Sequence, residues 1–140
     1  MDEYQVNERA VVHAYHLIDR KRFVIGTDWD HDRPTLAQRQ AFVARHSWNV
    51  YSWWHLGVDP NSLEHTIERY QFAIGDLTRV HRSALAGCLA RAERGGHHQL
   101  AEASMELLRR LDARAGITMT SDVASAMPLA MTFETVTRSS

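Results

Sequence analysis

The chain has 140 residues, of which 44% are hydrophobic and 24% are charged, with a formal net charge of −1 at pH 7. These values are typical of one water-soluble globular domain. The small net charge argues against a nucleic-acid or membrane partner bound through charge alone. No run approaches the roughly 18 apolar residues of a membrane span, and the acidic start, Met1–Tyr4, lacks a signal peptide's apolar run. We therefore expect a cytoplasmic protein.

The first forty residues predict two helices separated by irregular structure. Apolar residues at steps of three and four predict a helix over about 4–19. Residues 23–26 then read as a short strand or an extended loop, and residues 28–32 as an acidic loop. That loop is not a calcium site, because Arg33 and Arg39 stand where an EF-hand needs Gly and Glu. Thr35 and Gln38 form a capping box that predicts a helix to about Arg45.

The middle of the chain predicts further short helices. Ser47 should cap an aromatic helix that Gly57 ends. A second capping box at Asn61–Glu64 predicts a helix to about Tyr70, and residues 71–75 read as a connector.

The clearest helix of the sequence should follow, with Asp76 as its N-cap and Gly95-Gly96 at its end. A last helix should span about 97–113, with Gly116 after it. We expect residues 117–140 to form a loosely structured tail or a segment that packs on a partner. The predicted fold is all-α, a compact bundle of about five to six short helices in a single domain, residues 1–116.

The stretch 47–82 is unusually aromatic, since it holds three of the four tryptophans with Tyr51, Tyr70 and Phe72. Buried Trp and Tyr need partners for their polar atoms. This composition suits a pocket for a flat ligand, and it equally suits a polar-decorated core. Both interpretations stay open at this point.

Most catalytic and cofactor chemistry lacks a matching motif. The nine histidines form no HExxH pair, the single Cys88 has no base nearby in the sequence, and no phosphate-binding glycine loop occurs. We therefore expect no metal and no cofactor. General acid–base catalysis remains, with His55, Asp76 and His81 as candidates. The alternatives are a core role for His81 and a helix N-cap role for Asp76.

Two motifs carry a family resemblance. Residues 54–59 read WHLGVD and residues 69–82 read RYQFAIGDLTRVHR. They resemble the WHLGID and RYKFPYGDFRRVHR motifs of a family of small, mostly uncharacterised bacterial and archaeal proteins, and the resemblance covers about residues 28–114. The chain departs where Pro, Tyr, Phe and Cys are typical, at Ala73, Ile74, Leu77 and Ser83. These positions fall in the expected pocket and indicate a different ligand.

The chain also resembles proteins of this type that act as Pictet–Spengler cyclases in actinomycete alkaloid biosynthesis. That reaction condenses a tryptophan-like amine with an aldehyde and closes a ring through an indole carbon. The resemblance implies an aromatic cradle, an acid–base set and a carboxylate clamp. The cradle would be Trp53, Trp54, Tyr70 and Phe72, the acid–base set His55, Asp76 and His81, and the clamp Arg69 or Arg79.

The functional hypothesis is a cofactor-free biosynthetic enzyme that uses acid–base catalysis on a small aromatic amine. The alternative is a non-catalytic ligand-binding or protein-interaction module, in which the aromatic stretch is a pocket or a dimer face. We expect a homodimer, because several short helices and an apolar tail should leave patches to cover.

Overall fold

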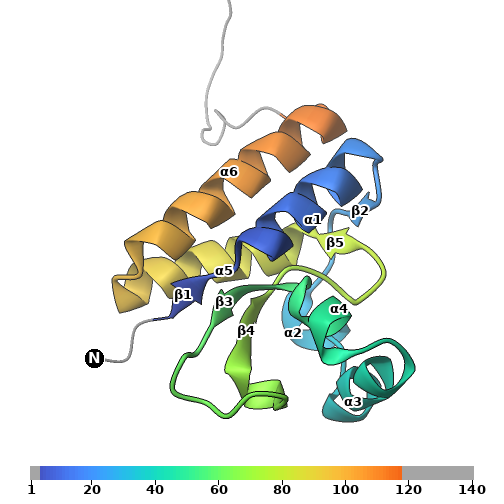
Figure 1. Ribbon diagram of the computed structural model, residues 1–140. Helices are drawn as coiled ribbons and strands as arrows, with labels where there is room; N and C mark the ends of the chain where they lie inside the picture. Colours follow the sequence, from blue (N-terminus) through green and yellow to red (C-terminus); the bar gives the residue numbers. More distant parts are fainter. Residues whose placement is uncertain (1–3, 118–140) are drawn as a thin grey trace, which may run out of the picture.

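The computed structural model describes residues 4–117, which form a small mixed α/β domain (Figure 1). The helices are α1 (Glu8–Asp19), α2 (Trp29–Asp32), α3 (Leu36–Arg45), α4 (Trp48–Ser52), α5 (Arg82–Gly95) and α6 (His98–Ala115), with a 3-10 turn at Ile67–Arg69. The strands are β1 (Gln5–Val6), β2 (Phe23–Val24), β3 (His55–Val58), β4 (Tyr70–Ala73) and β5 (Val80–His81). The all-α prediction is therefore wrong.

Two small sheets hold the strands. In the first, the order is β1-β3-β4 and all pairs are antiparallel, with His55 opposite Ala73 and Val58 opposite both Tyr70 and Gln5. In the second, β2 runs parallel to β5. The predicted strand or loop at 23–26 is thus a strand at Phe23–Val24. The predicted helix over 4–19 begins only at Glu8, because residues 5–6 pair with β3.

The helix predicted from Asn61 to Tyr70 and the connector at 71–75 are wrong, because this segment is the loop and second strand of a hairpin. The Asp59 N–H donates to the Arg69 carbonyl at 2.8 Å and closes the loop. The Asp59 carboxylate accepts from the Asn61 N–H and the Ser62 hydroxyl, both at 2.9 Å. Asn61 therefore belongs to a turn that Asp59 holds, instead of capping a helix.

Gly57 lies inside β3 and does not end a helix as predicted. A Cβ at this position would lie 2.7 Å from Cδ1 of Phe72 on β4. Phe72 itself has a φ of 65°, a left-handed conformation that is strained for an aromatic residue. The absence of a side chain at Gly57 lets the Phe72 ring pack directly on the β3 backbone.

Asp76 does not cap a helix, contrary to the prediction. Its Oδ1 accepts from the N–H groups of Thr78 and Arg79 at 2.9 and 2.7 Å and so holds a tight turn before β5. Helix α5 begins at Arg82 instead. The same short side chain can satisfy turn amides as readily as helix amides, so its local signal was ambiguous.

Other predicted helix boundaries are confirmed. The Thr35–Gln38 capping box is present at the start of α3, and Ser47 caps α4 by accepting from the Val50 N–H. Gly96 ends α5 and Gly116 ends α6, both in the left-handed conformation. Of the predicted tail, 117–140, all but Ile117 lies outside the described residues.

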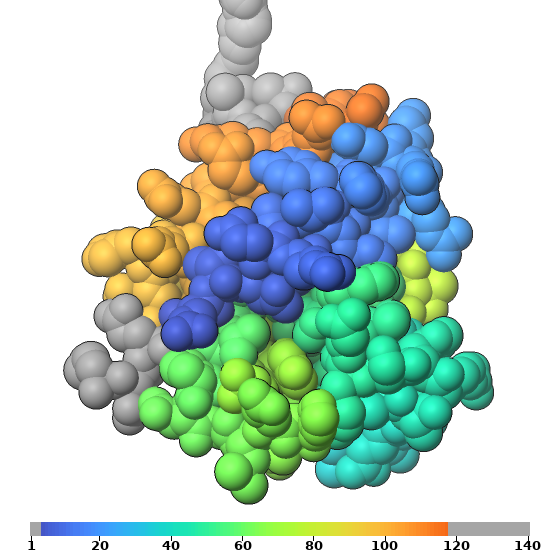
Figure 2. Space-filling model, in the orientation of Figure 1, coloured from blue at the N-terminus to red at the C-terminus, as the bar shows by residue number. Residues whose placement is uncertain are grey.

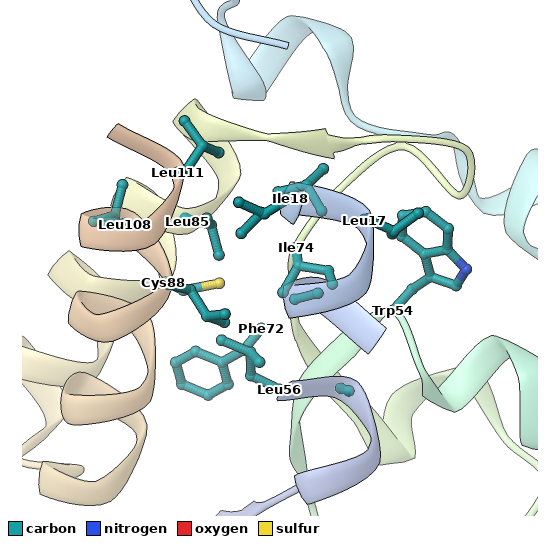
Figure 3. Close-up of a cluster of buried hydrophobic side chains, with 14 of the residues drawn as sticks. Leu17, Ile18, Trp54, Leu56, Phe72, Ile74, Leu85, Cys88, Leu108 and Leu111 are labelled. Atoms are coloured by element: carbon teal, nitrogen blue, oxygen red, sulfur yellow. The ribbon is translucent and has the colours of Figure 1, made fainter. Parts of the chain in front are cut away.

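The core lies between the three long helices and the β3–β4 hairpin. Figure 2 shows α1 packed against α6 on one side and against the green 40–60 region on the other. Each long helix contributes an apolar stripe, which meets strand residues in the centre (Figure 3). Fully buried examples are Ile18, Leu56, Ile74, Leu85, Leu107 and Leu111. Burial of each such side chain contributes about 1.5–3 kcal/mol.

A buried ion pair ties the start of α5 to the end of α6. Arg82 donates Nε and Nη2 to the two oxygens of Asp112 at 2.6 and 2.9 Å, and Asp112 is completely buried. The carboxylate raises the pKa of Arg82. This arginine, the last residue of the RYQFAIGDLTRVHR motif, therefore acts in the fold. Within residues 4–117, no helix is long and apolar enough to cross a membrane.

Replacing Gly57 by Ala should lower the unfolding free energy by about 1–3 kcal/mol, because the new methyl group meets the Phe72 ring. Urea denaturation measures the change. Gly87→Ala is the control, since no atom lies within 4 Å of its added Cβ in α5 and it should stabilise by about 0.5–1 kcal/mol. Equal effects of the two substitutions would show that the Gly57–Phe72 contact is not tight.

Asp112→Ala should lower the unfolding free energy by about 2–4 kcal/mol, because it leaves the Arg82 guanidinium without its anion. The matched control is Asp19→Ala, which removes an exposed carboxylate that binds Arg110 and Arg114. It should have a much smaller effect, since solvent screens that pair. Urea denaturation of both variants tests the prediction, and a larger loss for the Asp19 variant would contradict it.

Candidate functional site

A cleft of about 540 Å³ lies between α2 and α3 on one side and β3, β4 and α5 on the other. We call it the arginine cavity. Its walls combine aromatic rings, arginines, carboxylates and one histidine, which come from segments far apart in the sequence. These residues are Trp29, Tyr70 and Phe72; Arg33, Arg39, Arg91 and Arg94; Asp30 and Glu68; and His55.

Packing against neighbouring rings holds the aromatic wall in place. Tyr70 stacks on Trp48 with ring centroids 6.2 Å apart and meets Tyr51 edge-on at 5.8 Å. Phe72 carries the Arg91 guanidinium 4.2 Å above its ring. Tyr70 is partly exposed and can present a flat apolar surface to a ligand at little entropic cost, whereas Phe72 is 4% exposed and lies beneath Arg91. The wall therefore suits a planar ligand.

The cavity carries an excess of positive charge, because its four arginines face only two carboxylates. Arg91 is already engaged, since it donates to Tyr4 Oη at 3.0 Å and to Gln71 Oε1 at 3.2 Å. In the described part of the chain, the guanidinium groups of Arg33 and Arg94 form no hydrogen bond or ion pair. Guanidinium groups gathered around a cleft favour an anionic ligand, above all a carboxylate or a phosphate.

His55 sits in this cavity as a neutral ring with a defined tautomer. Its Nδ1 lies 3.1 Å from the Tyr51 carbonyl oxygen, which can only accept, so Nδ1 carries the hydrogen. Burial lowers the pKa of His55 to about 4, with Arg39 adding to the effect and the Tyr51 carbonyl opposing it. At neutral pH the lone pair is therefore on Nε2, the nitrogen left for a ligand. This is the geometry of a general base or a hydrogen-bond acceptor.

Tyr51 packs directly on His55, with ring centroids 4.5 Å apart. Its hydroxyl is buried and has no hydrogen-bond partner among the described residues. Burial raises the pKa of this hydroxyl, and the neighbouring Arg39 opposes the rise. The surroundings of His55 are thus more polar than a packed core requires.

Asp76 and His81 form a pair outside the cavity lining. His81 Nε2 lies 2.8 Å from Asp76 Oδ2, and His81 Nδ1 lies 3.0 Å from the Thr27 hydroxyl. Burial favours a higher pKa for Asp76, but hydrogen bonds from Arg79, His81 and Thr78 outweigh it and lower that pKa. Trp29, which lines the cavity, packs on the His81 ring at 5.2 Å. The pair therefore lies behind one aromatic wall of the cavity.

The structure gathers some predicted site residues and separates the others. His55, Tyr70 and Phe72 line the cavity together. Trp53 and Trp54 instead pack on His13 of α1, with ring centroids 5.6 and 5.0 Å apart. These two indoles are therefore not part of the same cradle.

The two predicted carboxylate clamps are also elsewhere. Arg69 donates Nη1 to the Ser62 carbonyl at 2.8 Å and holds the hairpin loop. Arg79 is exposed in the turn that Asp76 organises. The arginines of the cavity come from α3 and α5, and from the residue that follows α2.

Sequence reasoning missed Trp29 and all four cavity arginines. Arg33 and Arg39 entered only as residues that exclude a calcium loop. Arg91 and Arg94 lie three apart on α5, a spacing that places them on one face, and this was the available signal. The hairpin that brings Tyr70 and Phe72 against that face was not predicted, so nothing in the sequence connected these arginines with the aromatic residues.

Cys88 also lines the cavity, but it is not a nucleophile. Its thiol donates to the Ala73 carbonyl at 3.2 Å, and burial raises its pKa to about 12. Within residues 4–117, no three His, Cys, Asp or Glu side chains cluster as metal ligands. The expected absence of a metal stays a prediction.

None of the family models, curated proteins or solved structures compared with this chain matches it. The resemblance of its two motifs to a known family therefore stays a prediction.

The buried His55 should make the protein sensitive to acid. Because its pKa falls from 6.5 to about 4 on folding, the unfolded chain binds the proton more readily between these values. The stability that His55 contributes is complete above pH 6.5 and is lost as the pH falls toward 4. Between pH 7.5 and 4.5 the loss should be about 2–3 kcal/mol.

Urea denaturation at the two pH values measures this loss in the wild type and in His55→Asn, whose amide retains a donor for the Tyr51 carbonyl. The variant should lose much less stability than the wild type on acidification. His31→Asn, at a side chain that is 85% exposed, is the control and should behave like the wild type. An unchanged pH dependence in the His55 variant would refute the assignment.

Proposed function

We propose that this chain is a cofactor-free enzyme that binds a tryptophan-like amino acid in the arginine cavity and acts on it by acid–base catalysis. The observation that carries the proposal is the position of His55. Its neutral ring, with the lone pair on Nε2, lines the same cavity as an aromatic wall and charges of both signs. A flat amino acid would use all three features.

The cavity offers a place for each part of such a ligand. The indole ring would lie against Trp29 and Tyr70, and the volume of about 540 Å³ is within the usual range for small-molecule sites. Arg39 would bind the carboxylate through its two terminal nitrogens, because its charge acts on His55 and its Nε already donates to the Thr35 carbonyl at 3.4 Å. The ammonium group would face Glu68 or Asp30. Both charges of an amino acid then have a partner.

The reaction we expect is condensation of the amine with an aldehyde, followed by ring closure through an indole carbon. The amine and the aldehyde form an iminium ion and release water. The indole carbon then bonds to the iminium carbon, and the proton on that indole carbon must leave. His55 Nε2 would accept this proton. A carboxylate bound at Arg39 would favour the protonated ring, so substrate binding would strengthen the base.

Binding without catalysis is the alternative function of the same cavity. The low pKa of His55 in the free protein favours this alternative, since a base works best when its pKa is near the working pH. The two functions differ in turnover and not in binding, so binding and turnover are measured separately.

Calorimetric titration with L-tryptophan should show saturable binding, and Arg39→Met should weaken it about 10- to 100-fold through loss of charge-assisted hydrogen bonds. Arg45→Met, on the same helix but outside the cavity lining, is the control and should bind like the wild type. No binding of tryptophan or tryptamine by the folded wild type would overturn the proposed function. Equal losses in both variants would overturn the role of Arg39.

The catalytic part is tested by incubating the protein with tryptophan and a series of aldehydes and detecting the cyclised product by mass spectrometry. His55→Asn should bind tryptophan but form the product at least about 100-fold more slowly. If the wild type binds tryptophan but forms no product, the cavity is a binding site without catalysis and the enzymatic part of the proposal is rejected.

A further inference from the structure

A chain of hydrogen bonds runs from a carboxylate through a histidine to two hydroxyl groups. Asp76 Oδ2 lies 2.8 Å from His81 Nε2, and His81 Nδ1 lies 3.0 Å from Thr27 Oγ1. Thr27 Oγ1 in turn lies 2.9 Å from Ser83 Oγ. The members come from the loop before α2, the turn before β5, the end of β5 and the first turn of α5. The tertiary fold, not local sequence, assembles this chain.

The two ends of the His81 ring have different partners, and this fixes their roles. A carboxylate can only accept, so Nε2 carries a hydrogen toward Asp76. In the neutral ring, Nδ1 is then the acceptor and faces the Thr27 hydroxyl. This is the relation between orienting acid, base and nucleophile that activates a hydroxyl group in hydrolases.

The two residues that carry the hydroxyl groups are not sealed in the core. His81 is 4% exposed, whereas Thr27 and Ser83 are partly exposed. A base buried behind an accessible hydroxyl is the arrangement that nucleophilic catalysis needs. Trp29 packs on His81 and Ala84 follows Ser83, and both Trp29 and Ala84 line the arginine cavity. An acyl group could therefore reach Thr27 from the edge of that cavity.

We propose that Thr27 is the nucleophile of an acyl-transfer site, with His81 as its base and Asp76 as the residue that orients His81. The substrate class is a small activated ester. The site is separate from the function proposed for His55, because it uses neither the His55 ring nor the cavity arginines.

The reaction balances with water as the only co-reactant. Thr27 Oγ1 bonds to the acyl carbon while its proton moves to His81 Nδ1, and the ester oxygen leaves with that proton. Water then attacks the acyl-threonine and gives up a proton through His81, which releases the acid and restores the hydroxyl. The first amides of α5 lie next to Ser83, and the N-cap residue His81 supplies no side-chain cap for them. When Thr27 attacks the ester, negative charge develops on the carbonyl oxygen of the acyl group. The first amides of α5 are suitable hydrogen-bond donors for this oxyanion.

A fluorophosphonate probe tests this proposal, because it labels activated hydroxyl groups by forming an O–P bond and releasing fluoride. Intact mass and peptide mapping of the full chain should show one adduct, on Thr27. Labelling should fall below detection in Thr27→Val and about 100-fold or more in rate in His81→Gln. Thr66→Val is the matched control, since Thr66 donates to the Leu63 carbonyl in the hairpin loop, and it should be labelled like the wild type.

The same variants are then assayed for release of p-nitrophenol from p-nitrophenyl acetate, where a burst equal to the protein concentration is expected for the wild type. No adduct on the folded wild-type chain, or an adduct only on Ser83 or another residue, would overturn the proposal. The wild-type result does not depend on whether a variant folds. It is also independent of tryptophan binding, so this proposal and the one for the arginine cavity can fail separately.

Discussion

The packing of Phe72 is the contact on which most of the structure depends. Its ring lies on the bare backbone of Gly57, beneath the guanidinium of Arg91, and edge-on to Tyr4 at 5.2 Å and to His97 at 6.1 Å. One side chain thus joins the start of the chain, both hairpin strands, α5 and the residue before α6. Its left-handed backbone, with φ 65°, is strained, and these contacts together hold it in place. The same ring then forms a wall of the arginine cavity.

Several residues of the two sequence motifs stabilise the fold, and others belong to the candidate sites. Arg69 holds the hairpin loop, Gly57 accommodates Phe72, and Arg82 anchors α5 to the buried Asp112. Asp76 serves both purposes, since one oxygen holds the turn and the other faces His81. The motif residues that hold the β3–β4 hairpin against α5 therefore also place other side chains of the hairpin in the cavity wall. The presence of the motif alone does not show which of its residues contact a ligand.

The sequence predicted the parts of the fold that local interactions determine. Thr35 with Gln38, and the glycines that end α5 and α6, act within one helical turn, and these elements were found. The hairpin was missed because its stability comes from pairing between β3 and β4 and from Phe72 on Gly57, which are nonlocal. His55, Tyr70 and Phe72 were identified by their chemistry. The cavity arginines were not identified from the sequence, because they come together with those three residues only once the hairpin has formed.

Two histidines in contrasting surroundings are connected through Trp29, which lines the same cavity as His55 and packs on the ring of His81. Burial, with a smaller contribution from the nearby Arg39 guanidinium, keeps the His55 ring neutral, and the carbonyl that accepts from Nδ1 leaves Nε2 as the acceptor. His81 has a carboxylate on one nitrogen and a hydroxyl on the other, which direct its basic nitrogen at Thr27. Residue type alone made these histidines equivalent candidates, whereas their hydrogen-bond partners give them different chemistry.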